Sequence, residues 1–150
     1  MKGHCLCANV TIELEDIDTF EACHCGMCRR WGSGPLMNIH SHTKPEIQGE
    51  YSMTVYSSSE WAERAFWYKS GTNLYYHQLG SDTYVLSLGL FQGQPNLTFE
   101  SQIFIDKKPD YYAFANDTEN LTEQQLFDKF AEKGIETKDW FYFCACIKIN

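Results

Sequence analysis

Several features that would assign a chain to a common class are missing from this sequence. No run of 18 apolar residues occurs among its 150 residues, so no segment is expected to span a membrane. The first residues, MKGHCLC, lack the apolar stretch of a signal peptide, and we therefore expect a cytoplasmic protein. The chain also lacks internal repeats and low-complexity linkers, so we predict one domain that spans residues 1–150.

Positive charge is scarce as well. The 12 Lys and Arg residues face 20 Asp and Glu residues, which gives a formal net charge of −8 at pH 7. Such a surface repels phosphate backbones, so a nucleic acid is not expected as a partner. The chain is rich in apolar bulk, with 43% hydrophobic residues that include 10 Phe, 9 Tyr and 4 Trp. This content suffices for a hydrophobic core without disulfides.

The cysteines are unusually clustered for a chain of this size. Seven are present, at positions 5, 7, 23, 25, 28, 144 and 146. Their number is odd, and the cytosol keeps thiols reduced, so a disulfide framework is not expected. Clustered cysteines in that compartment more often bind a metal ion.

Short segments of alternating polarity predict a mainly β fold of short antiparallel strands. Such segments cover residues 10–15, 51–56, 73–77, 83–88 and 98–105, and a final strand is expected over 140–149. Gly, Asn and Asp separate them, as expected for turns. Their length and frequency favour a small sandwich or a curved meander.

One helix is predicted near the C-terminal end. Thr122 suits its N-cap, and Gln125 three residues later completes a capping box. Leu121 and Leu126 occupy the positions of a hydrophobic staple, and Gly134 is expected to end the helix. We expect a C-terminal extension to follow from about residue 135.

The segment FEACHCGMCRRWGSG, residues 20–34, holds the strongest candidate site. In extended chain, Cys23 and Cys25 share a face, and Gly26 gives the chain freedom to turn back so that Cys28 reaches the same ion. Three protein ligands with an open fourth position are typical of a catalytic zinc. The alternative is three reduced, metal-free thiols. His24 is not expected to be a ligand, because it points away from its neighbours in extended chain.

Cys5 and Cys7 form a second C-x-C pair. Two thiolates cannot complete a four-coordinate zinc site, so this pair needs further ligands from elsewhere in the chain.

Four motifs in order resemble one known family. GHCLCANV at 3–10 and CHCGMCRRWGSG at 23–34 are similar to the opening motifs of the glutathione-dependent formaldehyde-activating enzyme family, which includes centromere protein V. The segments at 57–76 and 101–117 resemble its later motifs. The resemblance covers about the first 130 residues.

The resemblance implies a fold, two metal ions and a reaction. The fold is a small β-tent. A structural zinc is held by four cysteines, from the first C-x-C (Cys5 and Cys7) and a later C-x-x-C, and a catalytic zinc is held by Cys23, Cys25 and Cys28. The implied activity is that of a carbon–sulfur lyase that joins formaldehyde and glutathione to S-(hydroxymethyl)glutathione.

The sequence departs from the family at the structural zinc. Trp67 and Ser70 occupy the places of the later cysteine pair. In one interpretation the site is metal-free and Trp67 fills its volume, so that the chain binds one zinc. In the other, Cys144 and Cys146 replace the lost ligands.

Two arginines directly follow the cysteine segment. A zinc with three thiolates carries one net negative charge, so a nearby cation would help it to accept a substrate thiolate. Arg29 and Arg30 can supply that charge or bind the carboxylates of glutathione. Alternatively, they pair with acidic residues of the chain or donate N–H groups to the cysteine sulfurs.

The sequence thus favours a zinc-dependent lyase that acts on adducts of a small thiol and a small aldehyde. The alternative is a non-catalytic zinc-binding module that binds a thiol or a protein partner. A redox role for the C-x-x-C of Cys25 and Cys28 is disfavoured, because such a motif opens a helix after a strand and no helix is predicted there.

Overall fold

The computed structural model describes residues 1–49, 53–94 and 96–132. They form two compact units, the first made of Met1–Phe20 with Met37–Thr98 and the second of Glu21–Leu36 with the chain from Phe99 on. That residues 1–150 act as one domain stays a prediction. The expected extension from about 135, the strand over 140–149 and the helix end at Gly134 lie outside the described residues.

The first unit contains a small antiparallel sheet in the order β1-β2-β5. Its strands are Lys2–His4, Thr11–Glu13 and Glu46–Gln48, and Ile12 pairs with both Gly3 and Ile47. Gly3 is required by close packing, because a Cβ at this position would lie 2.7 Å from the carbonyl oxygen of Leu90. The loop between β1 and β2 carries Cys5 and Cys7.

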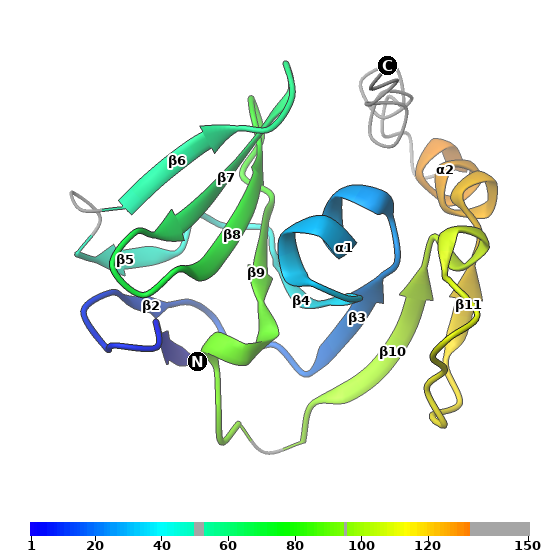
Figure 1. The fold of residues 1–150 in the computed structure, drawn as a ribbon, viewed down its shortest axis with the longest axis horizontal. Helices are drawn as coiled ribbons and strands as arrows, with labels where there is room; N and C mark the ends of the chain where they lie inside the picture. Colours follow the sequence, from blue (N-terminus) through cyan, green and yellow to red (C-terminus); the bar gives the residue numbers. More distant parts are fainter. Residues whose placement is uncertain (50–52, 95, 133–150) are drawn as a thin grey trace. The chain divides into compact units, whose positions relative to one another are not determined.

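Five further strands of this unit follow the order β4-β9-β8-β7-β6 (Figure 1). They span Leu36–Ser41 (β4), Met53–Ser57 (β6), Ala62–Trp67 (β7), Thr72–Gln78 (β8) and Tyr84–Ser87 (β9), and a 3-10 turn, η2, covers Leu88–Leu90. All pairings among β4, β9, β8, β7 and β6 are antiparallel. Their fully buried side chains, with those of the small sheet, form the core of the unit, including Ile12, Ile39, Leu74 and Leu86.

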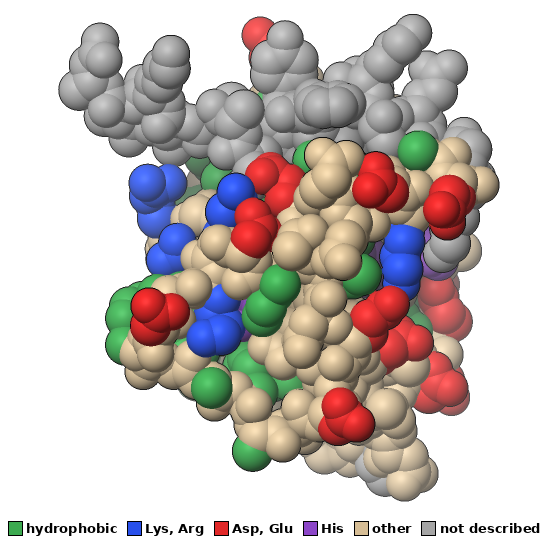
Figure 2. All heavy atoms as spheres, turned by 90° about the vertical axis from the view of Figure 1, so that its right-hand side faces the viewer, with side chains coloured by type: hydrophobic (Ala, Val, Ile, Leu, Met, Phe, Trp, Pro, Cys, Tyr) green, Lys and Arg blue, Asp and Glu red, His purple; other side chains and the backbone are tan. Residues whose placement is uncertain are grey.

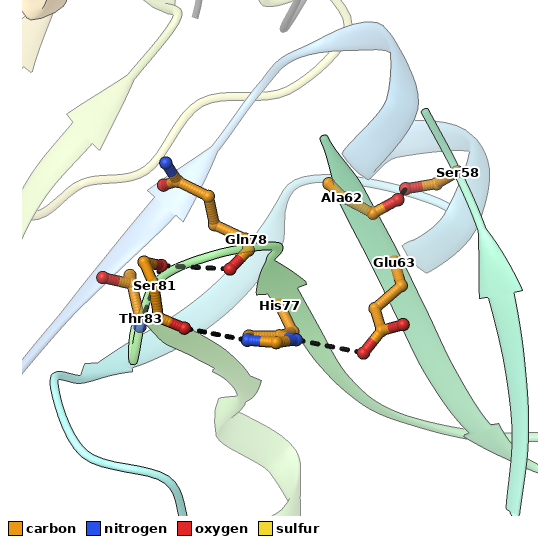
Figure 3. Close-up of polar contacts among 7 residues, drawn as sticks. All are labelled: Ser58, Ala62, Glu63, His77, Gln78, Ser81 and Thr83. Atoms are coloured by element: carbon orange, nitrogen blue, oxygen red, sulfur yellow. Dashed lines mark hydrogen bonds and ion pairs between the residues drawn. The ribbon is translucent and has the colours of Figure 1, made fainter. Parts of the chain in front are cut away.

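Polar side chains near the β8–β9 turn are matched with partners (Figure 3). The ring nitrogens of His77 lie 3.0 Å from Glu63 Oε1 and 3.0 Å from the Ser81 carbonyl oxygen. The Ser81 hydroxyl donates to the Gln78 carbonyl, and the His77 ring stacks on Tyr84 with centroids 4.2 Å apart. His77 therefore has a structural role in this turn.

The second unit carries three strands in the order β11-β10-β3. Strand β3 is Thr19–Cys23, β10 is Thr98–Ile103 and β11 is Glu119–Leu121, and a 3-10 turn, η3, covers Ile105–Lys107. Strands β10 and β11 are parallel, with Ser101 opposite Glu119. This parallel pair adds to the short antiparallel strands that the sequence predicts, and the mainly β fold class is confirmed.

Helix α2, Glu123–Glu132, begins as predicted. The backbone N–H of Thr122 donates to Gln125 Oε1 at 2.9 Å, and the N–H of Gln125 donates to Thr122 Oγ1 at 3.2 Å. These reciprocal bonds form the expected capping box. Leu121 and Leu126 are both buried, which fits the predicted staple.

A second helix, α1, spans Gly26–Gly32, where the sequence analysis predicts none. Cys25 is its N-cap, and its sulfur accepts a hydrogen bond from the N–H of Cys28 at 3.4 Å. The argument that this C-x-x-C does not open a helix after a strand is therefore wrong. The helix was missed because a cysteine cap is unusual and because glycines, which disfavour helix interiors, stand at both of its ends.

Acidic side chains are spread over most of the face drawn in Figure 2, as the net charge of −8 leads one to expect. Among the described residues, no helix has the length and apolar character needed to cross a bilayer.

Candidate metal centre

Three cysteine sulfurs converge in the second unit. Cys23 ends β3, Cys25 caps α1, and Cys28 lies in the first turn of that helix. Their Sγ atoms all lie within 4.8 Å of one another, and the side chains are 3%, 0% and 7% exposed. The structure thus brings together the three residues that the sequence predicts as ligands.

The local backbone explains the convergence. Cys23 and Cys25 are two positions apart where the chain leaves a strand, which places both side chains on one side. Cys25 and Cys28 are then related by the three-residue spacing that brings helical side chains to the same face. Strand, cap and first helical turn therefore form one binding loop.

Burial makes negative charge on the cluster unfavourable unless a cation compensates it. Hydrogen bonds with Cys25 and Cys28, followed by burial, raise the pKa of the Cys23 thiol well above its usual range. Three thiolates cannot coexist in such a buried place unless a positive ion compensates them. Tetrahedral zinc thiolate sites need sulfurs about 3.8 Å apart. The donor type and spacing fit this requirement, so the group can hold a metal ion.

His24 lies between two of these cysteines but is not part of the sulfur group. Gln102 donates its amide N–H to Thr118, so its Oε1 accepts from His24 Nε2 at 3.1 Å. Burial lowers the pKa of His24, and the Nδ1 of the neutral ring then accepts from the Tyr112 hydroxyl at 2.7 Å. Both ring nitrogens are engaged elsewhere, which agrees with the expectation that His24 is not a ligand.

A cavity of about 370 Å³ lies beside the same helix. Its lining residues are Gly26, Arg29, Arg30, Ser33, Gly34 and Tyr111. Its volume is in the range of small-molecule sites, which is roughly 300–1,000 Å³. Two of its lining residues directly follow cysteines of the three-sulfur group in the sequence, Gly26 after Cys25 and Arg29 after Cys28.

Arg29 and Arg30 both line the cavity. Arg29 uses its Nε–H to donate to the His24 carbonyl oxygen at 2.9 Å, which fixes its side chain along the wall of the cavity. Arg30 is exposed at the cavity. Within residues 1–49, 53–94 and 96–132, neither arginine forms an ion pair with a carboxylate. The alternative in which they pair with acidic residues therefore finds no support in the described part of the chain.

Tyr111 is a lining residue that the sequence analysis did not identify. It is 81% exposed and borders the cavity. No local pattern distinguishes it from the neighbouring Tyr112, which contacts His24. Only the path of the chain after η3 separates their positions.

The second C-x-C pair lies in the first unit and has a different environment. Cys5 is fully buried, Cys7 is exposed, and their sulfurs are 3.5 Å apart. The indole N–H of Trp67 donates to Cys7 Sγ at 3.1 Å. The backbone N–H of Asn9 is the largest cause that lowers the pKa of the Cys7 thiol to about 7.

This donor set does not fit a four-thiolate zinc site. Among the residues that the structure describes, Cys5 and Cys7 are joined by no third cysteine, histidine or carboxylate that would form a metal-binding group. Trp67, only 3% exposed, occupies the predicted position. Cys144 and Cys146 lie outside the described residues, so their replacement of the lost ligands stays a prediction.

Comparisons with known proteins agree with this architecture. The model of the glutathione-dependent formaldehyde-activating enzyme family matches residues 1–107. An uncharacterized lyase of Schizosaccharomyces pombe is 36% identical over 127 residues, which cover 83% of this chain and 93% of that protein. A crystal structure of a Rhodobacter sphaeroides protein shares the fold, with a TM-score of 0.54 and 24% identity over 63% of this chain and 90% of that chain. The chain therefore belongs to the glutathione-dependent formaldehyde-activating enzyme family.

Proposed function

We propose that this protein is a cytoplasmic, zinc-dependent carbon–sulfur lyase that acts on the adduct of a small thiol, such as glutathione, with formaldehyde or another small aldehyde. The family match and the relative named as a lyase support the reaction class. The observation that carries the proposal is that the cysteine sulfurs and the cavity-lining residues lie next to one another along one short helix. From Cys25 to Arg30, sulfur ligands and cavity-lining residues follow one another.

The reaction itself is a simple addition. In the direction of synthesis, the thiol sulfur attacks the aldehyde carbon, a C–S bond forms, and the carbonyl oxygen takes up the proton that the thiol gives up. The reverse reaction breaks the same C–S bond. A catalyst therefore has to hold the sulfur in its thiolate form and to position it against the aldehyde.

The three cysteines are the proposed zinc ligands. When bound, zinc would supply the Lewis acidity that keeps a thiol deprotonated at neutral pH. Cys23, Cys25 and Cys28 supply three negative charges against two positive ones, so the loaded centre carries one negative charge. A further thiolate is therefore favoured only if cations stand nearby.

Arg29 and Arg30 supply those cations in this proposal. Each guanidinium can bind a carboxylate through two parallel hydrogen bonds, and glutathione carries two carboxylates. Arg29 is already held in place by its bond to the His24 carbonyl, so little side-chain entropy remains to be lost when a substrate binds. The Tyr111 hydroxyl offers a further hydrogen bond at the rim. No catalytic side chain is assigned beyond the metal centre and these binding residues.

The test is a rate measurement on protein purified without added metal and with thiols kept reduced. Zinc per chain is measured first, and the exchange between formaldehyde, glutathione and their adduct is then followed by NMR. We expect one zinc per chain and an exchange rate above the uncatalysed one. Cys25→Ser is expected to lose both, whereas Cys7→Ser, the matched control in the other unit, keeps both.

Two results would contradict the proposal in different ways. Folded protein that holds one zinc but leaves the exchange rate unchanged for glutathione and for simpler thiols would favour the non-catalytic zinc-binding module. Folded protein without zinc and with free thiols at Cys23, Cys25 and Cys28 would remove the metal centre altogether.

A further inference from the structure

The loop between β1 and β2 holds a second group of reactive side chains. The Ala8 N–H donates to the Cys5 carbonyl at 2.8 Å, and the Cys5 N–H donates to the Val10 carbonyl at 3.0 Å. These bonds close the loop and hold the sulfurs of Cys5 and Cys7 3.5 Å apart. Because Trp67 replaces a family cysteine here, the pair has, within the described part of the chain, no further ligands that would occupy its sulfurs with zinc.

The two sulfurs differ in their access to solvent. Cys7 is exposed, and the neighbouring Leu6 is 83% exposed, so a reagent in solution can reach the Cys7 sulfur. Cys5 is 0% exposed, and a reagent in solution cannot reach it directly. The Cys7 sulfur is in contact with it. A reagent in solution can therefore react first only with Cys7, and Cys5 is in place to react with the Cys7 sulfur afterwards.

N–H groups converge on both sulfurs. Cys7 Sγ accepts from Trp67 Nε1 at 3.1 Å and from Asn9 Nδ2 at 3.4 Å, and Cys5 Sγ accepts from the Val10 N–H at 3.3 Å. Such donors stabilise negative charge on sulfur, both when it attacks and when it leaves. Trp67 therefore does more than fill the volume of a lost metal site.

We propose that Cys7 and Cys5 form a thiol–disulfide exchange site whose substrate is a small disulfide such as oxidised glutathione. This inference does not depend on the proposed lyase function, because it concerns other residues in the other unit. Cys7 is the attacking residue and Cys5 is the resolving residue.

The exchange has two balanced steps. The Cys7 thiolate attacks one sulfur of the reagent, the reagent S–S bond breaks, one glutathione thiolate leaves, and a mixed disulfide forms on Cys7. Cys5 then attacks the Cys7 sulfur, the mixed disulfide breaks, and the second glutathione leaves as a thiol that takes up the proton of Cys5. The chain keeps a Cys5–Cys7 disulfide, and two electrons have passed from the protein to the reagent.

The geometry indicates that this disulfide is easily reduced. Cysteines only two positions apart close a small ring, and strained disulfides have more oxidising potentials. Reduced glutathione is therefore expected to restore the dithiol, which makes the site reversible.

The experiment exposes the zinc-loaded, full-length protein to oxidised glutathione and quenches samples with acid over time. Cleavage after Glu13 or Glu15 separates Cys5 and Cys7 from the other cysteines, so mass spectrometry can assign each product. We expect a mixed disulfide on Cys7 first and the Cys5–Cys7 disulfide later. Cys5→Ser is expected to accumulate the mixed disulfide, and Cys7→Ser to leave Cys5 unmodified.

A matched variant tests the role of the indole N–H. Trp67→Phe keeps most of the aromatic volume and removes the donor, and it is expected to slow the first step about threefold. The order of the two steps is decided by the time course of the wild-type protein, so this test does not depend on whether a variant folds. The proposal is overturned if Cys7 reacts no faster than in denatured protein, or if a second zinc is found that protects Cys7.

Discussion

The two cysteine groups of this chain begin with the same C-x-C spacing but have different surroundings and different expected chemistry. In the second unit, Cys23 and Cys25 are followed by a helical turn that adds Cys28, and three buried sulfurs converge. In the first unit, Cys5 and Cys7 lie in a hairpin loop, and N–H groups that include the indole of Trp67 approach their sulfurs. One group can hold a metal ion, and the other presents an exposed thiol.

The comparison shows that the spacing of two cysteines is not enough to predict their chemistry. Three thiolates in a buried place are unfavourable without a compensating cation, so the three-sulfur group is suited to holding a metal ion. N–H donors around an exposed sulfur stabilise the thiolate without any metal. The difference lies in the groups that the rest of each unit places beside the cysteine pair, a third sulfur in one unit and N–H donors in the other.

The largest effect is expected from Cys25→Ser. Serine is a good helix N-cap, so this change removes a ligand while it preserves the start of α1. Zinc binding at cysteine sites is worth about 10–16 kcal/mol, so loss of one ligand is expected to weaken it by more than about 100-fold. Zinc per chain, measured after dialysis, checks this, with Cys7→Ser as the control. Retention of zinc by Cys25→Ser would contradict the assignment.

A second zinc is expected when the lost ligands are restored. The double variant Trp67→Cys with Ser70→Cys places two thiols where the family has them, and Cys5 and Cys7 supply the other two. Zinc content should rise from one to two per chain, and alkylation of Cys7 should stop. Trp67→Cys alone is the matched control. If the double variant folds but still binds one zinc, the two pairs do not face one another.

A smaller effect concerns the ionisation of Cys7. Its pKa is lowered from 9.0 to about 7, chiefly by the Asn9 N–H, so its alkylation rate should rise with pH around a midpoint near 7. Below this midpoint the thiol is protonated and slow to react, and above it the thiolate dominates. The folded protein is alkylated with iodoacetamide, and the rate is then determined from the fragment that ends at Glu13. A midpoint near 9 would show that the N–H donors do not stabilise the thiolate.

A weaker effect is expected from Arg30→Gln. The loss of one charge-assisted hydrogen bond to a substrate carboxylate should raise KM for glutathione about tenfold and leave kcat nearly unchanged. The side chain is exposed, so the fold should tolerate the change. Arg30→Lys keeps the charge and serves as the control. An equal rise in KM with a thiol that lacks carboxylates would argue against carboxylate binding.

No effect on zinc content is expected from Cys144→Ser. The structure does not describe this residue, but the three-cysteine group is complete without it. The measurement is again zinc per chain. A fall of one zinc would show that the C-terminal pair completes a second site with Cys5 and Cys7.

Much of the fold was predictable because it depends on local patterns. Alternating polarity predicted strands over residues 73–77 and 83–88, where the structure has β8 (Thr72–Gln78) and β9 (Tyr84–Ser87), and the capping box predicted the start of α2 at Thr122. Helix α1 was not predictable from propensity, because a cysteine side chain supplies its cap and glycines stand at both ends. The parallel pairing of β10 and β11 depends on contacts between distant segments, on which local patterns give no information.

The sequence by itself determined which residues are able to bind a metal, because ligand chemistry depends on side-chain type and the C-x-C-x-x-C spacing places three sulfurs in one short segment. It also showed that Trp67 and Ser70 stand where the family has cysteines. Only the tertiary structure decided that the Trp67 indole donates to Cys7, that Cys7 is exposed while Cys5 is buried, and that Tyr111 borders the cavity with Arg29. The physical reason is that exposure and hydrogen bonding are set by segments far apart in the chain, which meet only when the chain folds.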